Sequence, residues 1–278
     1  MARRGKGERP EPLPPPLPPE RRTVGQLVGE AIRAYGARFW KSLVLGVPVV
    51  VANALVWARP SGDLRLTLLP ITALLISVSY VLALGFVTGA DVRSRRGVVA
   101  YCLAVVLFLP VPLLVAIFIL PALVWLSLLG LAVPAVLVEG LGVRAALGRG
   151  IRLARADFAH VLGGLATLAL VVVISQFSLY FVLREYADNT RMIAAALAAL
   201  VVSPVVFLGS ALLYVDQEAR LRSRADRRKE SDADVPDADH VDREGRADPA
   251  RQSLPARGGE PRRRGDGRKG APPVGGAR

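Results

Sequence analysis

The most constraining feature of the chain is residues 97–138, a run of 42 residues without a charged side chain. As a helix this run would extend roughly 63 Å at about 1.5 Å per residue, about twice the ~30 Å hydrocarbon core of a bilayer. A soluble domain has no need of such a run. We therefore predict two successive membrane-crossing helices, divided near Pro121, where proline has no N–H to leave unpaired.

Four further uncharged runs raise the predicted number of spans to six. The shortest follows a basic segment directly, and the other three are long enough to cross with some tilt. The predicted class is an all-α polytopic membrane protein, with spans at about 42–58, 67–90, 98–118, 121–138, 161–183 and 193–215.

The segment before the first span is amphipathic. Thr23 and Gln26 have the spacing of a capping box, and apolar residues then recur on one helical face, opposite basic ones. Residues 145–160 form a second basic amphipathic segment, which also leads directly into a span. We predict two helices on the cytoplasmic membrane surface.

Lysine and arginine are distributed unequally between the two sets of connections. The N-terminal segment, residues 91–97, residues 139–160 and the C-terminal tail are arginine-rich, whereas the alternate connections hold few basic residues. This asymmetry predicts a protein of the cell membrane whose two termini both lie in the cytoplasm. The formal charge of +13 fits a protein that holds arginines against anionic lipid, and we expect no nucleic-acid partner.

The two ends of the chain are polar. Residues 1–22 are proline-rich and residues 217–278 are charged and of low complexity, so both are predicted to be disordered. Residues 16–21 match a PxxPxR pattern that peptide-recognition domains bind, and the charged tails could contact a membrane or cytoplasmic protein partner. A stiff solvated tail explains the same residues.

The chain contains a weak internal repeat. When residues 26–45 are aligned with 145–164, several identities coincide, among them Ile32 with Ile151 and Phe39 with Phe158. Both copies begin on the same predicted side, so the repeat would be parallel. Chance matching in so biased a composition remains the alternative.

The predicted spans contain no charged residue, which leaves proton-coupled transport without its usual groups. Asn53 and Gln176 are the most polar intramembrane side chains, with an interhelical hydrogen bond or a substrate contact as their alternative roles. Gly85 and Gly89 have GxxxG spacing, which predicts a helix-contact face. The candidate functional or packing positions are Asn53, Gly85, Gly89, Pro134, Glu139, Arg152, Arg155, Asp157, Phe158, Gln176, Tyr214 and Asp216.

No catalytic, cofactor-binding or metal-binding motif is visible, and we expect no cofactor. Cys102 is the only cysteine, which excludes a disulfide framework. Acids at the cytoplasmic edge, such as Glu139 and Asp157, suit either work on a lipid headgroup or, more simply, pairing with nearby arginines.

Residues 138–158 contain Val138-Glu139-Gly140, Ala145-Ala146-Leu147 and Gly150-Ile151-Arg152, continuing to Asp157-Phe158. With Phe39-Trp40 and the closing Leu213-Tyr214-Val215-Asp216, this stretch resembles a bacterial six-span family. That family is similar to the membrane domain fused ahead of some bacterial glycerophosphodiester phosphodiesterases. The resemblance covers about residues 23–222, with Gly150 where the family usually has serine. No phosphodiesterase domain is visible, so the resemblance implies a membrane domain without hydrolase activity.

The sequence supports three functional hypotheses. The first is a non-catalytic membrane module that organises lipids or partner proteins, and it rests on the basic surface helices and the absent buried charge. The second is a transporter or permeation subunit for a neutral or lipid-like solute, and it rests on the repeat and on the prolines in the spans. The third is a membrane enzyme that uses Glu139 and the arginines after it.

Overall fold

The computed structural model describes residues 18–19, 22–57 and 62–233, and these contain helices and no strand. Six segments are long and apolar enough to cross a membrane, as predicted. They are Phe39–Val56, Leu68–Thr88, Arg95–Ile117, Ile119–Glu139, Phe158–Val182 and Asp188–Arg228. The chain is therefore an all-α, multi-pass integral membrane protein. Residues up to Lys229 belong to one compact unit, and a second unit begins at Glu230.

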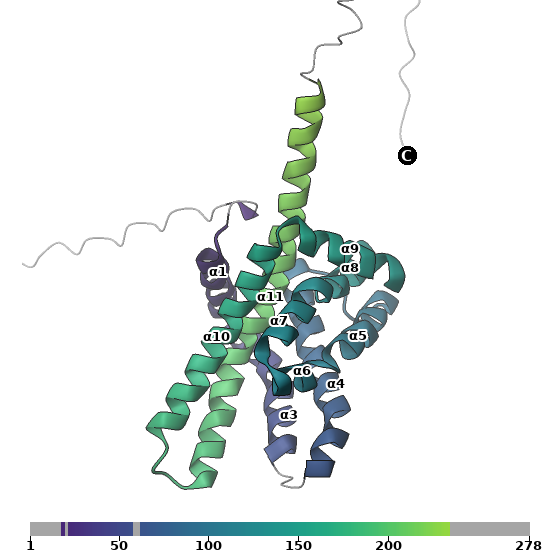
Figure 1. Ribbon diagram of the computed structural model, residues 1–278. Helices are drawn as coiled ribbons and strands as arrows, with labels where there is room; N and C mark the ends of the chain where they lie inside the picture. The colour runs from purple at the N-terminus through teal and green to yellow at the C-terminus, as the bar shows by residue number, and fades with distance from the viewer. Residues whose placement is uncertain (1–17, 20–21, 58–61, 234–278) are drawn as a thin grey trace, which may run out of the picture. The chain divides into compact units, whose positions relative to one another are not determined.

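The first part of the chain is an amphipathic helix followed by a long hairpin (Figure 1). Thr23 caps the first helix through the predicted box, in which Gln26 N donates to Thr23 Oγ1 and Thr23 N donates to Gln26 Oε1. The elements are α1 (Val24–Ala37), α2 (Phe39–Leu43), a 3₁₀ turn η2 (Val44–Gly46), α3 (Val47–Trp57) and α4 (Gly62–Thr88).

The last part has the same plan, with α9 (Val143–Ala156), α10 (Phe158–Val182) and α11 (Asp188–Ala233). Asp157 caps α10, since its Oδ1 accepts from His160 N at 3.3 Å. Pro70 in α4 and Pro204 in α11 lie inside helices that continue past them. In Figure 1 the α3–α4 and α10–α11 hairpins extend in the same direction.

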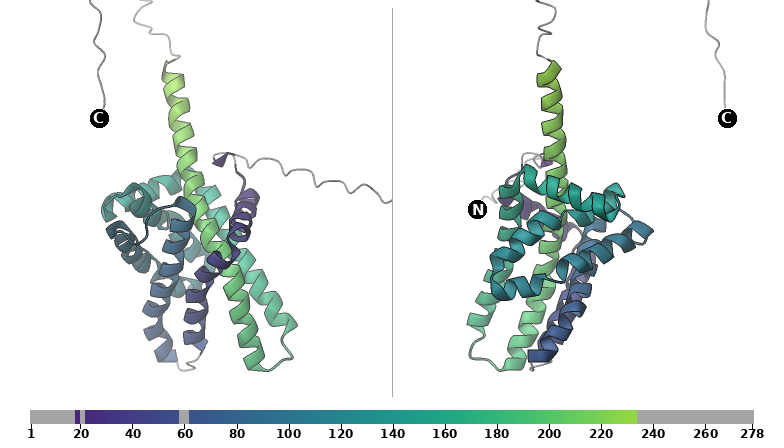
Figure 2. Two further views of the ribbon diagram at one scale, coloured as in Figure 1. Left: turned by 180° about the vertical axis from the view of Figure 1, so that it is seen from behind. Right: turned by 45° about the vertical axis from the view of Figure 1, so that its right-hand side comes forward.

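The middle part is a shorter hairpin made of broken helices, α5 (Arg95–Phe108), α6 (Val111–Ile117), α7 (Ile119–Leu129) and α8 (Ala132–Glu139). The 14 residues of α5 reach about 21 Å, less than the ~30 Å of a hydrocarbon core. Figure 2 shows that α6 and α7 stop short of the level reached by the free ends of α4 and α10. Spans three and four are therefore bent segments that pack against the longer hairpins.

Two of the breaks in this middle hairpin lie beside a carbonyl that a side chain satisfies. Trp125 Nε1 donates to Leu107 O at 2.9 Å, next to the break before α6. Tyr80 Oη donates to Gly130 O at 3.1 Å, at the break between α7 and α8. Freed backbone groups in a membrane need such partners, because lipid supplies none.

The core is built mostly from small and aliphatic residues. A larger cluster joins α4, α5, α8 and α11, with single residues from α1, η2 and α9, and a smaller one joins α1, α9, α10 and α11. Both predicted surface helices contribute to these clusters. Leu27 and Tyr35 of α1 are buried, and α9 buries Leu153 and Ala154. The apolar faces of α1 and α9 therefore pack against protein rather than lying wholly in lipid.

The helix bounds reproduce the internal repeat. Each bound of α9 lies 119 residues after the corresponding bound of α1 (24 to 143, 37 to 156), and the next helix starts at Phe39 in one copy and Phe158 in the other. The three residues that α1 buries correspond to three that α9 buries. These pairs are Leu27 with Ala146, Ala31 with Gly150, and Tyr35 with Ala154. Residues 24–57 and 143–182 thus share one local plan.

Three details correct the sequence analysis. The division between spans three and four was predicted near Pro121, but the chain turns at Phe118, whose backbone is extended. Pro121 lies in the first turn of α7, where its missing N–H breaks no helical bond.

The second correction concerns the C-terminal tail. Residues 217–233, assigned to the disordered tail, continue α11, because Leu221 packs on the core and Arg222 pairs with Glu218 one turn away. The rest of the predicted disorder, at 1–17, 20–21 and 234–278, lies outside the described residues.

The third correction concerns the glycine pair. Gly89 follows the end of α4 with a φ of 71°, and its N–H donates to Gly85 O, so it caps the helix instead of lying on its surface. A Cβ at Gly85 would lie 2.6 Å from the Val92 side chain. Gly85 therefore makes room for the α4–α5 connection, and the GxxxG helix-contact prediction was wrong.

Candidate functional site

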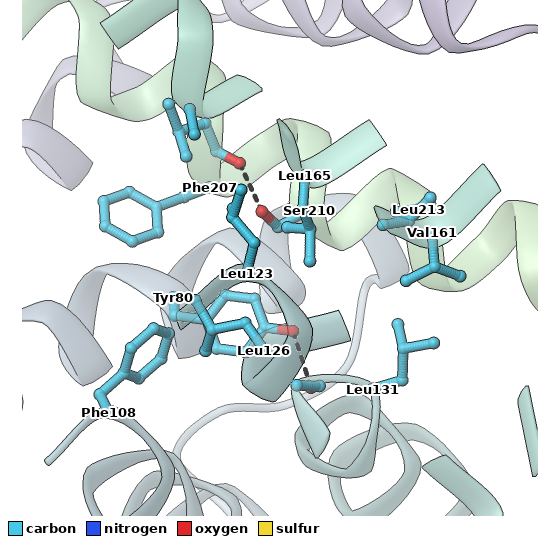
Figure 3. Close-up of a pocket in the computed structure, with 13 residues that line it drawn as sticks. Tyr80, Phe108, Leu123, Leu126, Leu131, Val161, Leu165, Phe207, Ser210 and Leu213 are labelled. Carbon is cyan, nitrogen blue, oxygen red and sulfur yellow. Dashed lines mark hydrogen bonds between the residues drawn. The ribbon is translucent and has the colours of Figure 1, made fainter. Parts of the chain in front are cut away.

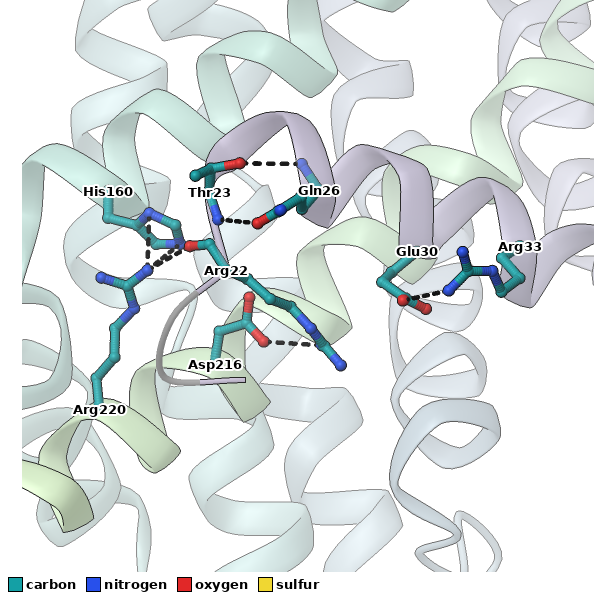
Figure 4. A network of polar contacts seen from close by, with 8 residues as sticks. All are labelled: Arg22, Thr23, Gln26, Glu30, Arg33, His160, Asp216 and Arg220. Atoms are coloured by element: carbon teal, nitrogen blue, oxygen red, sulfur yellow. Dashed lines mark hydrogen bonds and ion pairs between the residues drawn. The ribbon is translucent and has the colours of Figure 1, made fainter. Parts of the chain in front are cut away.

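A network of ion pairs joins the start of α1 to the later helices (Figure 4). Arg22 Nη1 lies 3.0 Å from Asp216 Oδ1, and the Asp216 side chain is fully buried. Arg220 Nη1 donates to Asp157 Oδ2 at 2.7 Å, and its Nη2 donates to the Arg22 carbonyl. The beginnings of α1 and α10 are therefore fixed to one turn of α11.

A second cluster lies where α8, α9 and α11 meet. Arg149 Nε donates to both carboxylate oxygens of Glu139 at 3.1 Å, and Tyr214 Oη donates to Oε1 at 2.8 Å. Gly140 then reverses the chain with a φ of 69°, and a Cβ there would lie 2.9 Å from Arg96 Cζ. Both oxygens of Glu139 are thus engaged in holding three helices together.

These contacts place the arginine-rich connections at one end of the bundle. Asp216 meets Arg22, and Gly140 meets Arg96, so the start of α1, the α4–α5 connection, the α8–α9 connection and the continuation of α11 are neighbours. We call this the arginine-rich end. At the other end Arg184 pairs with Glu185 and Arg191 with Asp188.

Arg149 and Arg220 each pair with an acid, whereas other basic residues of the arginine-rich end are exposed and have no acidic partner among the described residues. Arg144, Arg152 and Arg155 of α9 are exposed and make no ion pair with any described residue. At 100° per residue they lie within about 80° of one another on the helix, on the side away from the buried face. Further exposed cations without a described acidic partner include Arg38, Lys41, Arg93, Arg95 and Arg96.

Several cavities lie beside the α10–α11 hairpin. The first, which we call the apolar cavity, measures about 130 Å³ and lies among α4, α5, α7, α10 and α11 (Figure 3). Its polar groups are already bonded within the protein: Tyr80 donates to Gly130 O, and Ser210 donates to Val206 O. The other lining residues are aliphatic or aromatic, apart from Gly130.

The second, which we call the amide cavity, measures about 480 Å³ and lies between α3, α10 and α11. Asn53 and Gln176, 123 positions apart in the chain, both line it, together with Ser203. Neither amide bonds to another described residue, and Ser203 Oγ is a buried atom with no partner there. The remaining lining residues are Val49, Ala54, Val172, Met192, Ile193, Ala195, Ala196, Ala199 and Val202.

The structure separates the predicted positions into groups. It brings Glu139 to Tyr214, and it brings Asn53 and Gln176 to one cavity, but no hydrogen bond between these two amides is present. Asp157 and Asp216 each pair with an arginine, as the simpler prediction for these acids had it. Phe158 begins α10, Pro134 lies in the first turn of α8, and Arg152 and Arg155 are exposed.

Four participants were not selected from sequence. Arg22, Arg149 and Arg220 pair with Asp216, Glu139 and Asp157, of which Asp216 is buried and the other two are half-buried. An acid in such a place needs a cation, but the sequence did not indicate which arginine supplies it. Gln217 is fully buried, and its amide atoms have no hydrogen-bond partner among the described residues. Its position directly after an apolar run gave no sign of burial.

No group of three or more potential metal-ligating side chains occurs among the described residues. No family model, curated protein or solved structure matches the chain. The resemblance to the membrane domain of glycerophosphodiester phosphodiesterases stays a prediction.

Proposed function

We propose that the protein is a non-catalytic module of the cell membrane that gathers anionic lipids at its arginine-rich end, with both termini in the cytoplasm. The observation that carries this proposal is the outer face of α9. Arg144, Arg152 and Arg155 point away from the bundle without acidic partners among the described residues, whereas Arg149 on the inner side pairs with Glu139.

The packing of α9 supports this role. Ala146, Gly150 and Leu153 hold the helix against the bundle, and a Cβ at Gly150 would lie 2.7 Å from Ala132 N. The arginines therefore project from a fixed scaffold. Each basic residue near an anionic bilayer surface contributes about 1 kcal/mol of attraction, so a cluster of this size concentrates phosphate-bearing lipids around the protein.

The contrast between the two ends supports the orientation. The cations of the arginine-rich end outnumber their acidic partners among the described residues, while Arg184 and Arg191 at the other end are each paired with an acid. An excess of basic residues is typical of cytoplasmic connections.

Lipid analysis of the protein extracted in native nanodiscs tests the proposal. Replacing Arg144, Arg152 and Arg155 by glutamine is expected to lower the ratio of anionic to zwitterionic lipid around the protein at least threefold. The matched control replaces Arg184 and Arg191 at the other end and leaves the ratio unchanged. An equal loss in both variants, or no loss in the first, contradicts the proposal.

Cysteine accessibility tests the orientation separately. In a Cys102→Ala background, a cysteine at Ser94 is expected to react with a membrane-impermeant thiol reagent only after the cells are opened. A cysteine at Asp188 should react in intact cells. The reverse pattern would place the termini outside.

A permeation role for a neutral or lipid-like solute is the second candidate. The breaks at Pro110, Phe118 and Gly130 favour it, because interrupted helices are typical of solute sites in transporters. Solute flux into liposomes that requires the purified protein, and that disappears on Asn53→Leu, is the result expected from this role.

A further inference from the structure

The amide cavity lies between the two copies of the repeat. Val49, Asn53 and Ala54 come from α3 of the first copy, and the opposite wall comes from α10 and α11 of the second. Asn53 and Val172 lie 119 residues apart, so they occupy equivalent repeat positions on opposite walls. Solute sites in repeat-built membrane proteins commonly form at such an interface.

The polar groups of this cavity have no partners within the described protein. An amide or hydroxyl removed from water without a hydrogen bond costs about 1–3 kcal/mol by mutational measures. The Ser203 hydroxyl is such a buried group, and the exposed Asn53 amide and the half-buried Gln176 amide make no hydrogen bond to another described residue. Both amides lie in segments apolar enough to cross a membrane, where lipid offers them no partner. The apolar cavity differs, because its Tyr80 and Ser210 hydroxyls donate to backbone carbonyls.

The lining indicates the charge and character of an occupant. No charged residue lines the amide cavity among the described residues, so a charged group placed there would be uncompensated. The amides offer both donors and acceptors, and the alanine-rich face of α11 offers an apolar wall. A volume of 480 Å³ lies within the ~300–1,000 Å³ usual for small-molecule sites.

A neighbouring cavity lies next to this one, toward the far end of the hairpin. Gln176 and Ala195 line both the amide cavity and a neighbouring cavity of about 190 Å³ that includes Tyr180 and Arg191. Arg191 and Ser203 are 12 residues apart on α11, so the two cavities together follow roughly 18 Å of helix. This length suits an elongated molecule aligned with the lipid chains.

From these observations we infer that the amide cavity binds one uncharged acylglycerol-type lipid, with its ester and hydroxyl groups hydrogen-bonded by Asn53 and Gln176 and its hydrocarbon against the alanines of α11. This site is separate from the arginine-rich end and takes a different class of lipid.

Photo-crosslinking of the full-length protein tests this inference. A diacylglycerol and a phosphatidylglycerol, each with the same diazirine-bearing acyl chain, are added to the protein in nanodiscs, and labelled peptides are mapped. The diacylglycerol probe is expected to label α3, α10 and α11 around the cavity at least fivefold more than the anionic probe. Equal labelling by the two probes overturns the inference.

Two neighbouring residues provide a matched pair of variants. Ala196→Phe fills the cavity and is expected to reduce labelling about tenfold, whereas Leu197→Phe on the exposed side of the same turn leaves it unchanged. Equal labelling of the two variants shows general lipid contact and overturns the inference.

The double variant Asn53→Leu with Gln176→Leu tests the hydrogen bonds without filling the space. It is expected to reduce diacylglycerol labelling at least fivefold without lowering the melting temperature. This variant also tests the inference if Ala196→Phe fails to fold. Undiminished labelling overturns it. Glutamine substitution of the three α9 arginines should leave this labelling unchanged, so the two proposals succeed or fail separately.

Discussion

The two copies of the repeat share helix bounds but differ in how the next membrane span begins. After α9, α10 begins at a capped residue and continues for 25 residues. After α1, the first span begins at Phe39, and the preceding Arg38 gives no side-chain cap. This span passes through a 3₁₀ turn before α3. The turn includes Gly46, which lies directly against the backbone of Leu200.

This difference shows how one local pattern adapts to two environments. The amphipathic helix and the aromatic start of the next helix are preserved, whereas the shape of the span depends on its neighbour. The first span bends where it meets α11, and the fifth has side-chain space on its corresponding side, where Leu165 lines the apolar cavity. Substitutions in the two copies measure how far this explanation holds.

The largest expected effect is at the bend. Gly46→Ala would place a Cβ 2.3 Å from Leu200 O, a contact with backbone that side-chain rotation cannot relieve, and should destabilise the protein by about 3 kcal/mol. Gly163→Ala, in the second copy, meets only Val24 at 3.6 Å and should change stability by less than about 0.5 kcal/mol. Unfolding in mixed SDS micelles measures both; equal values would refute the close-contact explanation.

Next come the equivalent buried positions Ala31 and Gly150. Gly150→Ala should destabilise by about 2 kcal/mol, because the added Cβ lies 2.7 Å from Ala132 N. Ala31→Gly, which removes a buried Cβ from α1, should cost about 1 kcal/mol. The same unfolding measurement applies, and a stabilising Gly150→Ala would show that α8 and α9 separate easily.

The two residues between the helices should also differ. Asp157→Ala removes the cap of α10 and the partner of Arg220, with an expected loss of about 2 kcal/mol. Arg38→Ala, at the equivalent position in the first copy, removes an exposed side chain and should stay within about 0.5 kcal/mol of the native protein. Thermal melting in detergent compares the pair, and similar melting temperatures would contradict the asymmetry.

The smallest effect should be the same in both copies. Gly29 and Gly148 are equivalent helical positions, and a Cβ at either meets no atom within 4 Å. Each Gly→Ala substitution should therefore stabilise by about 0.5–1 kcal/mol through helix propensity alone. A gain in one copy and a loss in the other, seen as opposite shifts in melting temperature, would show that the two helices are not equivalent.

Much of the fold was predictable because hydropathy acts locally. The uncharged runs indicated six spans, and Thr23 and Gln26 indicated the start of α1. The GxxxG prediction was wrong because spacing alone does not show where a helix ends, and Gly89 lies just beyond that end.

The candidate sites were less predictable, because they depend on contacts between distant residues. Asn53 and Gln176 were selected for polarity, yet nothing in the sequence placed them in one cavity. The partner of Asp216 was equally hidden, since many arginines lie nearer in the sequence than Arg22.

The sequence by itself determined that this chain crosses a membrane several times with its arginines gathered in particular connections, because transfer of each residue between water and lipid depends mainly on that residue and its neighbours. The tertiary structure alone decided the bend at Gly46, the short middle hairpin and the cavity shared by Asn53 and Gln176. Those features arise from packing between helices far apart in the chain, where shape complementarity, and not hydropathy, selects the partner.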